Sequence, residues 1–212
     1  GVSFWQLICF LGLWLLQVWL LRRWGMAGVH KLAWYGAPVL VGAALLLVLW
    51  AWVQADGFHS MLSSKSSFVS GGPMVGQENL VFPPYVAQMA ALWMLLAINI
   101  PDYTRYMADQ RQQALGQLVG LPLAIAFFTL VGATIPFATV DIFNIEVVDP
   151  IEVVGRLGGF SKLFGLLVLI LAAVTTNLFA HLVPAATGIA SLRPERLDLG
   201  KAATVAGVAS LA

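Results

Sequence analysis

Polar side chains interrupt an otherwise apolar sequence at two places where their types could support binding chemistry. The first is Asn99 to Asp102, where Pro101 removes a backbone donor and frees a carbonyl four residues upstream. The second is Thr175-Thr176-Asn177, followed four residues later by His181. An unpaired polar group in hydrocarbon costs free energy, so these two places are the candidates for a functional site.

The threonine-bearing stretch offers groups of two kinds. Hydroxyl and carbonyl oxygens suit a hard cation such as sodium, whereas an amide and an imidazole suit the hydrogen-bonding edge of a polar heterocycle. Helical spacing puts Ala172 and Thr176 on one face and Asn177 with His181 on the adjacent face, before Pro184 ends or kinks the helix. Alternatively, the threonines bond back to carbonyls of their own helix and the other groups link helices. Spacing alone leaves both interpretations open.

The proline-bearing stretch also has two interpretations. A helix broken at Asn99, Pro101 and Asp102 would expose the carbonyls and half-helix ends from which secondary transporters build sites near the midplane. Alternatively, Asp102 caps a cytoplasmic helix that starts at Tyr103. Trp93 lies six residues before Asn99. An indole in the middle of a span is most often a packing or lipid contact, but at this break it could stack on a flat substrate.

The elements that must position these residues are membrane-spanning helices. The 212 residues are 60% hydrophobic and 10% charged, with a mean hydropathy of +0.87, whereas a soluble domain is roughly 45–50% apolar and about 25% charged. We expect an all-α integral membrane protein with a single transmembrane domain over residues 1–212. The expected helices are 4–21, 32–53, 84–106, 115–140, 161–183 and a truncated 202–212, with an outer loop at 54–83 and a short outer helix at 150–158 that Asp149 caps and Pro150 begins.

The basic residues fall mainly on one side of these expected crossings. Eight lie in one set of connections: Arg22, Arg23, Lys31, Arg105, Arg111, Arg193, Arg196 and Lys201. Three lie in the other set: Lys65, Arg156 and Lys162. Because cytoplasmic loops carry the excess of lysine and arginine, we expect the first set to face the cytoplasm.

Several classes of function are disfavoured by the sequence. A net charge of +1, with basic residues explained by topology, gives no support for nucleic-acid binding. The sequence has no pair of intramembrane carboxylates, no histidine-rich metal spacing and no nucleophile elbow, so we expect neither an enzyme nor a bound cofactor. The single cysteine, Cys9, excludes an intrachain disulfide framework. The expected partners are a small molecule and membrane lipid.

Three motifs make the sequence resemble the nucleobase:cation symporter-1 family, the permeases for hydantoins, allantoin, cytosine, uracil and related compounds. The motifs are Asn99-Ile100-Pro101-Asp102-Tyr103-Thr104-Arg105-Tyr106, Gly116-Gln117 to Leu121-Pro122, and Thr175-Thr176-Asn177-Leu178-Phe179-Ala180-His181 leading to Pro184. The first and third are specific when they occur together at this separation. The similarity extends over the whole chain, including Phe4-Trp5-Gln6.

The resemblance implies a fold and an activity. Members have twelve transmembrane helices, the first ten forming two inverted five-helix repeats as in the leucine-transporter-like fold, and this chain would run from the fourth helix to the start of the ninth. We therefore expect a portion of a longer transporter, since the chain opens at Gly1 and closes in an apolar run, 204–212, that is too short to span. The expected function is secondary transport of a nucleobase-like heterocycle across the cytoplasmic (inner or plasma) membrane by alternating access. Sodium is the expected coupling ion and the proton the alternative.

The resemblance also assigns roles to individual residues. It implies that Trp93 stacks on the substrate and that the Ala172 carbonyl, Thr175 and Thr176 form an incomplete sodium site, whose other ligands lie on helices of the same parent chain upstream of Gly1. His181 occupies a position that is asparagine in hydantoin-type members, which leaves the substrate open; with Asn177 it is our candidate for substrate hydrogen bonding. We expect Asn99, Pro101 and Asp102 to form the gating break. The competing interpretations are an amino-acid or other small-solute transporter of the same fold, or a membrane scaffold subunit.

Overall fold

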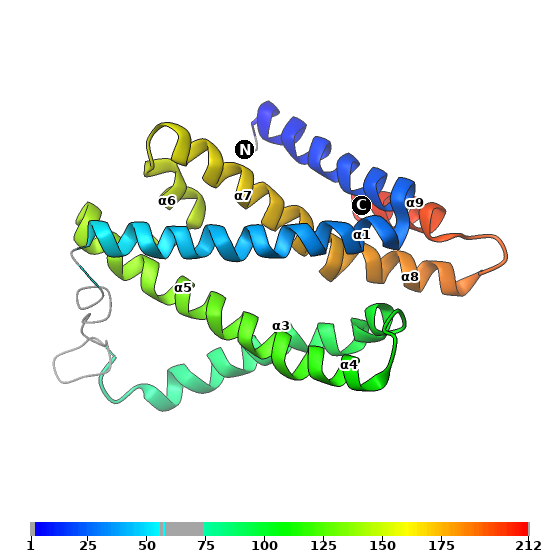
Figure 1. Ribbon diagram of the computed structural model, residues 1–212, viewed down its shortest axis with the longest axis horizontal. Helices are drawn as coiled ribbons and strands as arrows, with labels where there is room; N and C mark the ends of the chain where they lie inside the picture. Colours follow the sequence, from blue (N-terminus) through cyan, green and yellow to red (C-terminus); the bar gives the residue numbers. More distant parts are fainter. Residues whose placement is uncertain (1–2, 56, 58–73, 212) are drawn as a thin grey trace. The chain divides into compact units, whose positions relative to one another are not determined.

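The chain is helical over the part that the structure, a computed structural model, describes, namely residues 3–55, 57 and 74–211 (Figure 1). The elements are α1 (Phe4–Gln54), α3 (Glu78–Thr104), α4 (Gln110–Leu115), η1 (Gly116–Gly120), α5 (Leu121–Phe143), α6 (Pro150–Arg156), α7 (Gly159–Asn177), η2 (Leu178–Leu182), α8 (Val183–Leu192) and α9 (Leu199–Ala209), where η denotes a π-helix. Most of the loop expected at 54–83 lies outside the described residues. Three helical stretches are long and apolar enough to cross a membrane: Phe4–Gln54, Gln110–Phe143 and Gly159–Leu192. The prediction of an all-helical membrane protein is confirmed.

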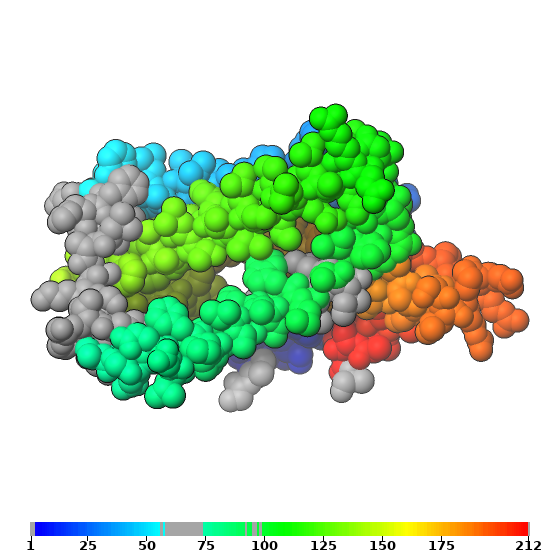
Figure 2. All heavy atoms as spheres, turned by 90° about the horizontal axis from the view of Figure 1, so that it is seen from below, coloured from blue at the N-terminus to red at the C-terminus, as the bar shows by residue number. Residues whose placement is uncertain are grey.

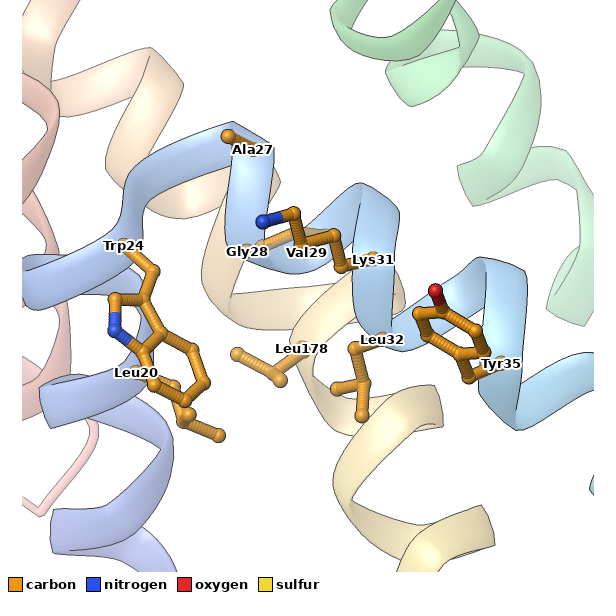
Figure 3. A pocket seen from close by; sticks show the side chains of 9 residues that line it. All are labelled: Leu20, Trp24, Ala27, Gly28, Val29, Lys31, Leu32, Tyr35 and Leu178. Atoms are coloured by element: carbon orange, nitrogen blue, oxygen red, sulfur yellow. The ribbon is translucent and has the colours of Figure 1, made fainter.

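A sharp bend divides α1 into two helices. Gly25 has φ 54° and ψ −152°, a conformation that glycine adopts readily because it lacks a β-carbon. The ribbon turns between Trp24 and Ala27 (Figure 3). A straight helix of 51 residues would be about 77 Å long, more than twice the roughly 30 Å hydrocarbon core, so the bend makes two segments of spanning length. The two apolar runs that the sequence predicts at 4–21 and 32–53 lie on either side of it.

The described chain forms two compact units, residues 1–42 with 163–212 and residues 43–162. In the first unit, α9 packs on the first half of α1 through small residues. Gly207 lies against Val18, and Gly200 lies against the backbone oxygen of Arg22. Trp14 Nε1 donates a hydrogen bond to Ser210 Oγ (3.2 Å), and small residues at such contacts let helices approach closely.

The second unit is built around a small apolar core. Ala51 and Ala55 from the end of α1, Ile135 and Ala138 from α5, and Val153 from α6 are buried together. The short α6 begins at Pro150, and the side chain of Asp149 accepts a hydrogen bond from the N–H of Ile151 (2.8 Å). This is the start that a capping aspartate followed by proline predicts.

The predicted break at Asn99, Pro101 and Asp102 is not present in α3, which stays helical to Thr104. Pro101 lies in the last turn, where its missing N–H costs the helix one hydrogen bond close to an end that already lacks partners. The alternative, in which Asp102 caps a helix starting at Tyr103, is also wrong. Asp102 forms an ion pair with Arg105, and the next helix begins at Gln110 with Asp109 as its cap.

The two π-helices share a sequence feature. Both η1 and η2 end two residues before a proline, Pro122 in one case and Pro184 in the other. A proline ring clashes with the carbonyl four residues upstream, and a wider turn moves that carbonyl away. At η2 the N–H of Val183 donates to Leu178 O, five residues back.

Large apolar side chains are exposed on most of the helices. Examples are Trp34 at 78%, Phe160 at 80% and Leu80 at 74% exposed. On the face shown in Figure 2, side chains of α3 lie uncovered along the helix. An apolar surface of this extent is unfavourable in water and fits contact with lipid or with other transmembrane helices.

Candidate cation and substrate site

The hydroxyl of Thr175 is already engaged within its own helix. Thr175 is buried, and its Oγ1 donates to Leu171 O (2.8 Å) and Ala172 O (3.0 Å). This is the back-bonding that the alternative interpretation of the sequence expects. The same geometry places the Ala172 carbonyl and the Thr175 hydroxyl side by side, and donation of the hydroxyl proton leaves its oxygen lone pairs free, so a cation would have two adjacent oxygens.

Helix α1 packs against the methyl group of Thr175. A β-carbon built on Gly36 would lie 3.6 Å from Thr175 Cγ2, an ordinary van der Waals contact. Thr176, the next residue, is exposed. Ala172, Thr175 and Thr176 together supply three oxygens on one helix, and the remaining ligands of a hard cation must come from other elements.

Asn177 is held by Gln17, a polar residue within the first apolar run of the sequence. Asn177 Nδ2 donates to Gln17 Oε1 at 2.6 Å, and Gln17 Nε2 donates to Leu13 O at 3.2 Å. Gln17 is 8% exposed. A buried amide in the middle of an apolar span was the sequence signal for this residue, because such a group needs a partner.

His181 lies in η2, and its side chain is exposed. The period of an α-helix predicts that Asn177 and His181 lie on one face. A π-turn holds more residues, so this period does not apply from Leu178 to Leu182. Pro184 is the sequence signal for the change. π-bulges are frequent at functional sites, which keeps His181 among the candidates.

The candidates on α3 belong to the second unit, whereas Ala172 to His181 belong to the first, and the structure defines each group within its own unit. Trp93 is 40% exposed. At the end of α3, the side chain of Arg105 bonds both Asp102 and the carbonyl of Pro101 (Nε to O, 3.3 Å). The structure therefore gathers Pro101 and Asp102 around one arginine.

A cavity of about 690 Å³ lies beside the bend in α1 (Figure 3). Its walls are mainly apolar, with Trp24 and Tyr35 as the aromatic groups, Lys31 as the charged group, and Leu178 contributed by η2. None of the site residues predicted from the sequence lines this cavity. Among the described residues, no group of three or more His, Cys, Asp or Glu side chains could hold a metal ion.

Helices of spanning length, an apolar exterior and polar groups set into the spans define a multi-pass α-helical membrane protein. The chain belongs to the family of permeases for cytosine/purines, uracil, thiamine and allantoin, whose sequence profile matches residues 1–212. This confirms the resemblance to nucleobase:cation symporter-1 permeases. It also confirms the expectation of a transporter class and not an enzyme class.

Individual relatives agree with the family. The chain is 35% identical to the purine-uracil permease NCS1 of Arabidopsis thaliana over 209 residues, which are 98% of this chain and 34% of the relative. It is 23% identical to the allantoin permease of Bacillus subtilis over 212 residues (100% and 42%), and 25% identical to the uridine permease of Saccharomyces cerevisiae over 180 residues (80% and 27%). The chain thus spans about a third of the length of these proteins. No solved structure matches the chain.

Proposed function

We propose that this chain forms the middle part of a cation-coupled secondary transporter that carries a nucleobase or a related heterocycle across the cytoplasmic membrane. The family match over all 212 residues is the observation that carries the proposal. The names of the relatives favour purines, uracil, allantoin or uridine as the substrate. The polar groups of α7 and η2 support it independently, because such groups within a membrane span are costly and mark binding sites.

The cation, sodium in this proposal, binds at Ala172 O, Thr175 and Thr176. The adjacent oxygens of Ala172 and Thr175 support this assignment (3.0 Å apart). Because the Thr175 hydroxyl donates its proton to the helix carbonyls, its oxygen lone pairs stay free to ligate the ion. Other helices of a leucine-transporter-like, five-plus-five inverted-repeat fold supply the remaining ligands.

The family resemblance assigns substrate stacking to Trp93, and the chemistry of Asn177 and His181 suits hydrogen bonds with the substrate. Nucleobases and allantoin are polar compounds whose edges carry N–H donors and carbonyl acceptors. An indole offers a flat apolar face, whereas an amide and an imidazole each offer a donor and an acceptor. These three side chains match both the face and the edge of such a compound.

Transport follows by alternating access between outward-open and inward-open states. A ligand shifts this equilibrium only by its differential affinity for the two states, so coupling requires that cation and substrate together favour closure around the site. The end of α3 is the proposed gate. Pro101 weakens the last turn of α3, and Asn99 lies just before this turn. When the turn opens, the ion pair between Asp102 and Arg105 can break.

Uptake by the full-length protein in proteoliposomes tests the proposal. Labelled uracil, allantoin, cytosine and hydantoin are offered with an inward sodium gradient, a pH gradient, or neither. We expect saturable uptake of at least one heterocycle, accelerated by the sodium gradient. Acceleration by the pH gradient alone would replace sodium with the proton. Uptake of amino acids in place of every heterocycle would overturn the substrate class.

A further inference from the structure

The hydrogen bond between Gln17 and Asn177 joins residues 160 positions apart in the sequence. Gln17 belongs to the first half of α1, and Asn177 is the last residue of α7. Both lie in the same compact unit. The buried Gln17 therefore ties α1 to the turn at which α7 gives way to η2.

The network fixes which way both amides face. Leu13 O can only accept, so the Gln17 group that faces it at 3.2 Å must be the NH₂. The Gln17 oxygen then faces Asn177, which must donate its own NH₂ at 2.6 Å. The oxygen Oδ1 of Asn177 is consequently the atom turned away from Gln17. Within the part of the chain that the structure describes, this oxygen accepts no hydrogen bond.

We propose that Gln17 is a positioning residue for substrate specificity, which locks the amide of Asn177 so that its Oδ1 accepts a hydrogen bond from a ring N–H of the substrate. This inference rests on the proposed function, in which Asn177 contacts the heterocycle. Without Gln17 the amide could turn over and present its NH₂ instead. The lock selects heterocycles that keep a ring N–H donor against analogues in which this nitrogen is alkylated, because an alkylated nitrogen cannot donate to Oδ1 and the bound complex loses this hydrogen bond.

The choice of amide partner explains why the lock needs a buried glutamine. A hydroxyl or a water at this place can both donate and accept, so it would allow either orientation of Asn177. Because the NH₂ group of Gln17 is turned to Leu13 O, its oxygen is the atom that faces Asn177, and this oxygen can only accept. The carbonyl of Leu13 therefore orients the amide of Gln17, and Gln17 in turn orients the amide of Asn177.

Kinetics of the full-length transporter with three probes test this role. Uracil, N1-methyluracil and N3-methyluracil are compared in the natural protein, Gln17→Met, Asn177→Ala and the double variant. Methionine has nearly the volume of glutamine and offers no comparable acceptor. Gln6→Met is the matched control, because Gln6 lies on the same helix, is exposed, and bonds only to nearby Ser3.

In the natural protein we expect at least one methyl derivative to have a KM about tenfold above that of uracil, the effect of one hydrogen bond. Gln17→Met should raise the KM for uracil about tenfold, change the KM for that derivative less than twofold, and leave the maximal rate within twofold. In the Asn177→Ala background the same change should have no further effect, since the glutamine acts through the asparagine.

The outcomes separate the two claims. If Asn177→Ala leaves every KM unchanged, the proposed contact of Asn177 with the substrate fails. If Asn177→Ala raises the KM for uracil but Gln17→Met preserves the discrimination between probes, only the positioning role fails. If Gln17→Met raises the KM equally for all three probes and lowers the thermal midpoint, Gln17 only packs the helices together, and the inference is overturned.

Discussion

Gly207 on α9 lies so close to Val18 on α1 that a β-carbon at Gly207 would come within 2.6 Å of Val18 Cγ2. Trp14 borders the same contact at 3.3 Å. Two helices of one unit thus meet where one has no side chain, and the approach depends on this absence.

Gly207→Ala should therefore destabilise the packing of α9 on α1 by about 1–3 kcal/mol, the usual cost of overpacking. Thermal unfolding of the full-length protein in detergent measures the effect. Gly188→Ala is the control, because a β-carbon there meets nothing within 4 Å and alanine favours a helix. Equal midpoints for Gly207→Ala and the natural protein would contradict close packing at this point.

Thr139 secures the loop that follows α5. Its hydroxyl donates to Pro136 O (2.6 Å) and accepts from the N–H of Val147 (2.8 Å), and both residues are almost completely buried. Thr139→Val should cost about 1–3 kcal/mol, because the N–H of Val147 loses its partner in an apolar environment. Thr139→Ser should restore most of the stability.

Thr134→Val is the matched control for this change. Among the described residues, the Thr134 hydroxyl bonds only to Leu130 O and Val131 O of its own helix, so its removal leaves no buried N–H donor without a partner. Urea or thermal unfolding of the three variants should place Thr139→Val lowest. A Thr134 variant that is equally destabilised would show that the loss comes from valine in α5 and not from the loop contact.

Asp198 should give the start of α9 an acid-dependent stability. The backbone N–H of Lys201 donates to Asp198 (2.7 Å), and this bond holds the pKa of the carboxyl below its ordinary value of 3.8. A carboxyl with a lowered pKa in the folded state stabilises it above the unfolded pKa, and this stability is lost as the pH falls through the folded pKa.

Hydrogen exchange of the α9 amides at pH values between 6 and 3 measures this dependence. Protection in the natural protein should fall at the acid end. Asp198→Asn should show no such fall, because asparagine caps helices without titrating. A carbon NMR titration that places the carboxyl pKa at or above 3.8 would contradict the assignment.

The helical membrane character of the chain and the cap of α6 could be predicted from the sequence because they depend on local properties. Runs of apolar residues set the length of a span, and Asp149 followed by Pro150 fixes a helix start without reference to distant residues. The error at Asn99 to Asp102 has a local cause too. Proline and aspartate predict an interruption, but Pro101 lies so near the end of α3 that the helix loses little by continuing.

The link between Gln17 and Asn177 could not be predicted, because it depends on which helices pack together. Each residue was visible as a polar group in an apolar run, yet their pairing spans 160 residues. The π-turn at His181 is intermediate. Pro184 predicts that the regular α-helix is interrupted near this point. Whether the interruption is a kink or a wider turn depends on the packing of Leu178 and Leu182, which are buried.

Trp93 should contribute substrate affinity by stacking. Replacing an aromatic group that stacks on a base costs roughly 1–3 kcal/mol, so Trp93→Ala should raise the KM for uracil by about tenfold or more, and Trp93→Phe by less. Uptake kinetics of the full-length protein measure both variants. Trp34→Ala serves as the control, because Trp34 is 78% exposed and lies outside the proposed site. An unchanged KM in Trp93→Ala would remove the stacking role.

The threonines should control the dependence on sodium. Thr175→Val and Thr176→Val each delete one proposed ligand oxygen while keeping the shape of the side chain, so the sodium concentration for half-maximal uptake should rise about tenfold or more, while uptake at saturating sodium changes less. The control is Thr187→Val on α8. Thr187 bonds back to Val183 O (2.8 Å) much as Thr175 bonds to Leu171 O, but it lies beyond the proposed site. If the sodium concentration for half-maximal uptake rises equally in all three variants, the hydroxyls act only through their hydrogen bonds within the helix. If only Thr176→Val changes the sodium dependence, the Thr175 hydroxyl does not ligate the ion, and Thr175 is removed from the proposed cation site.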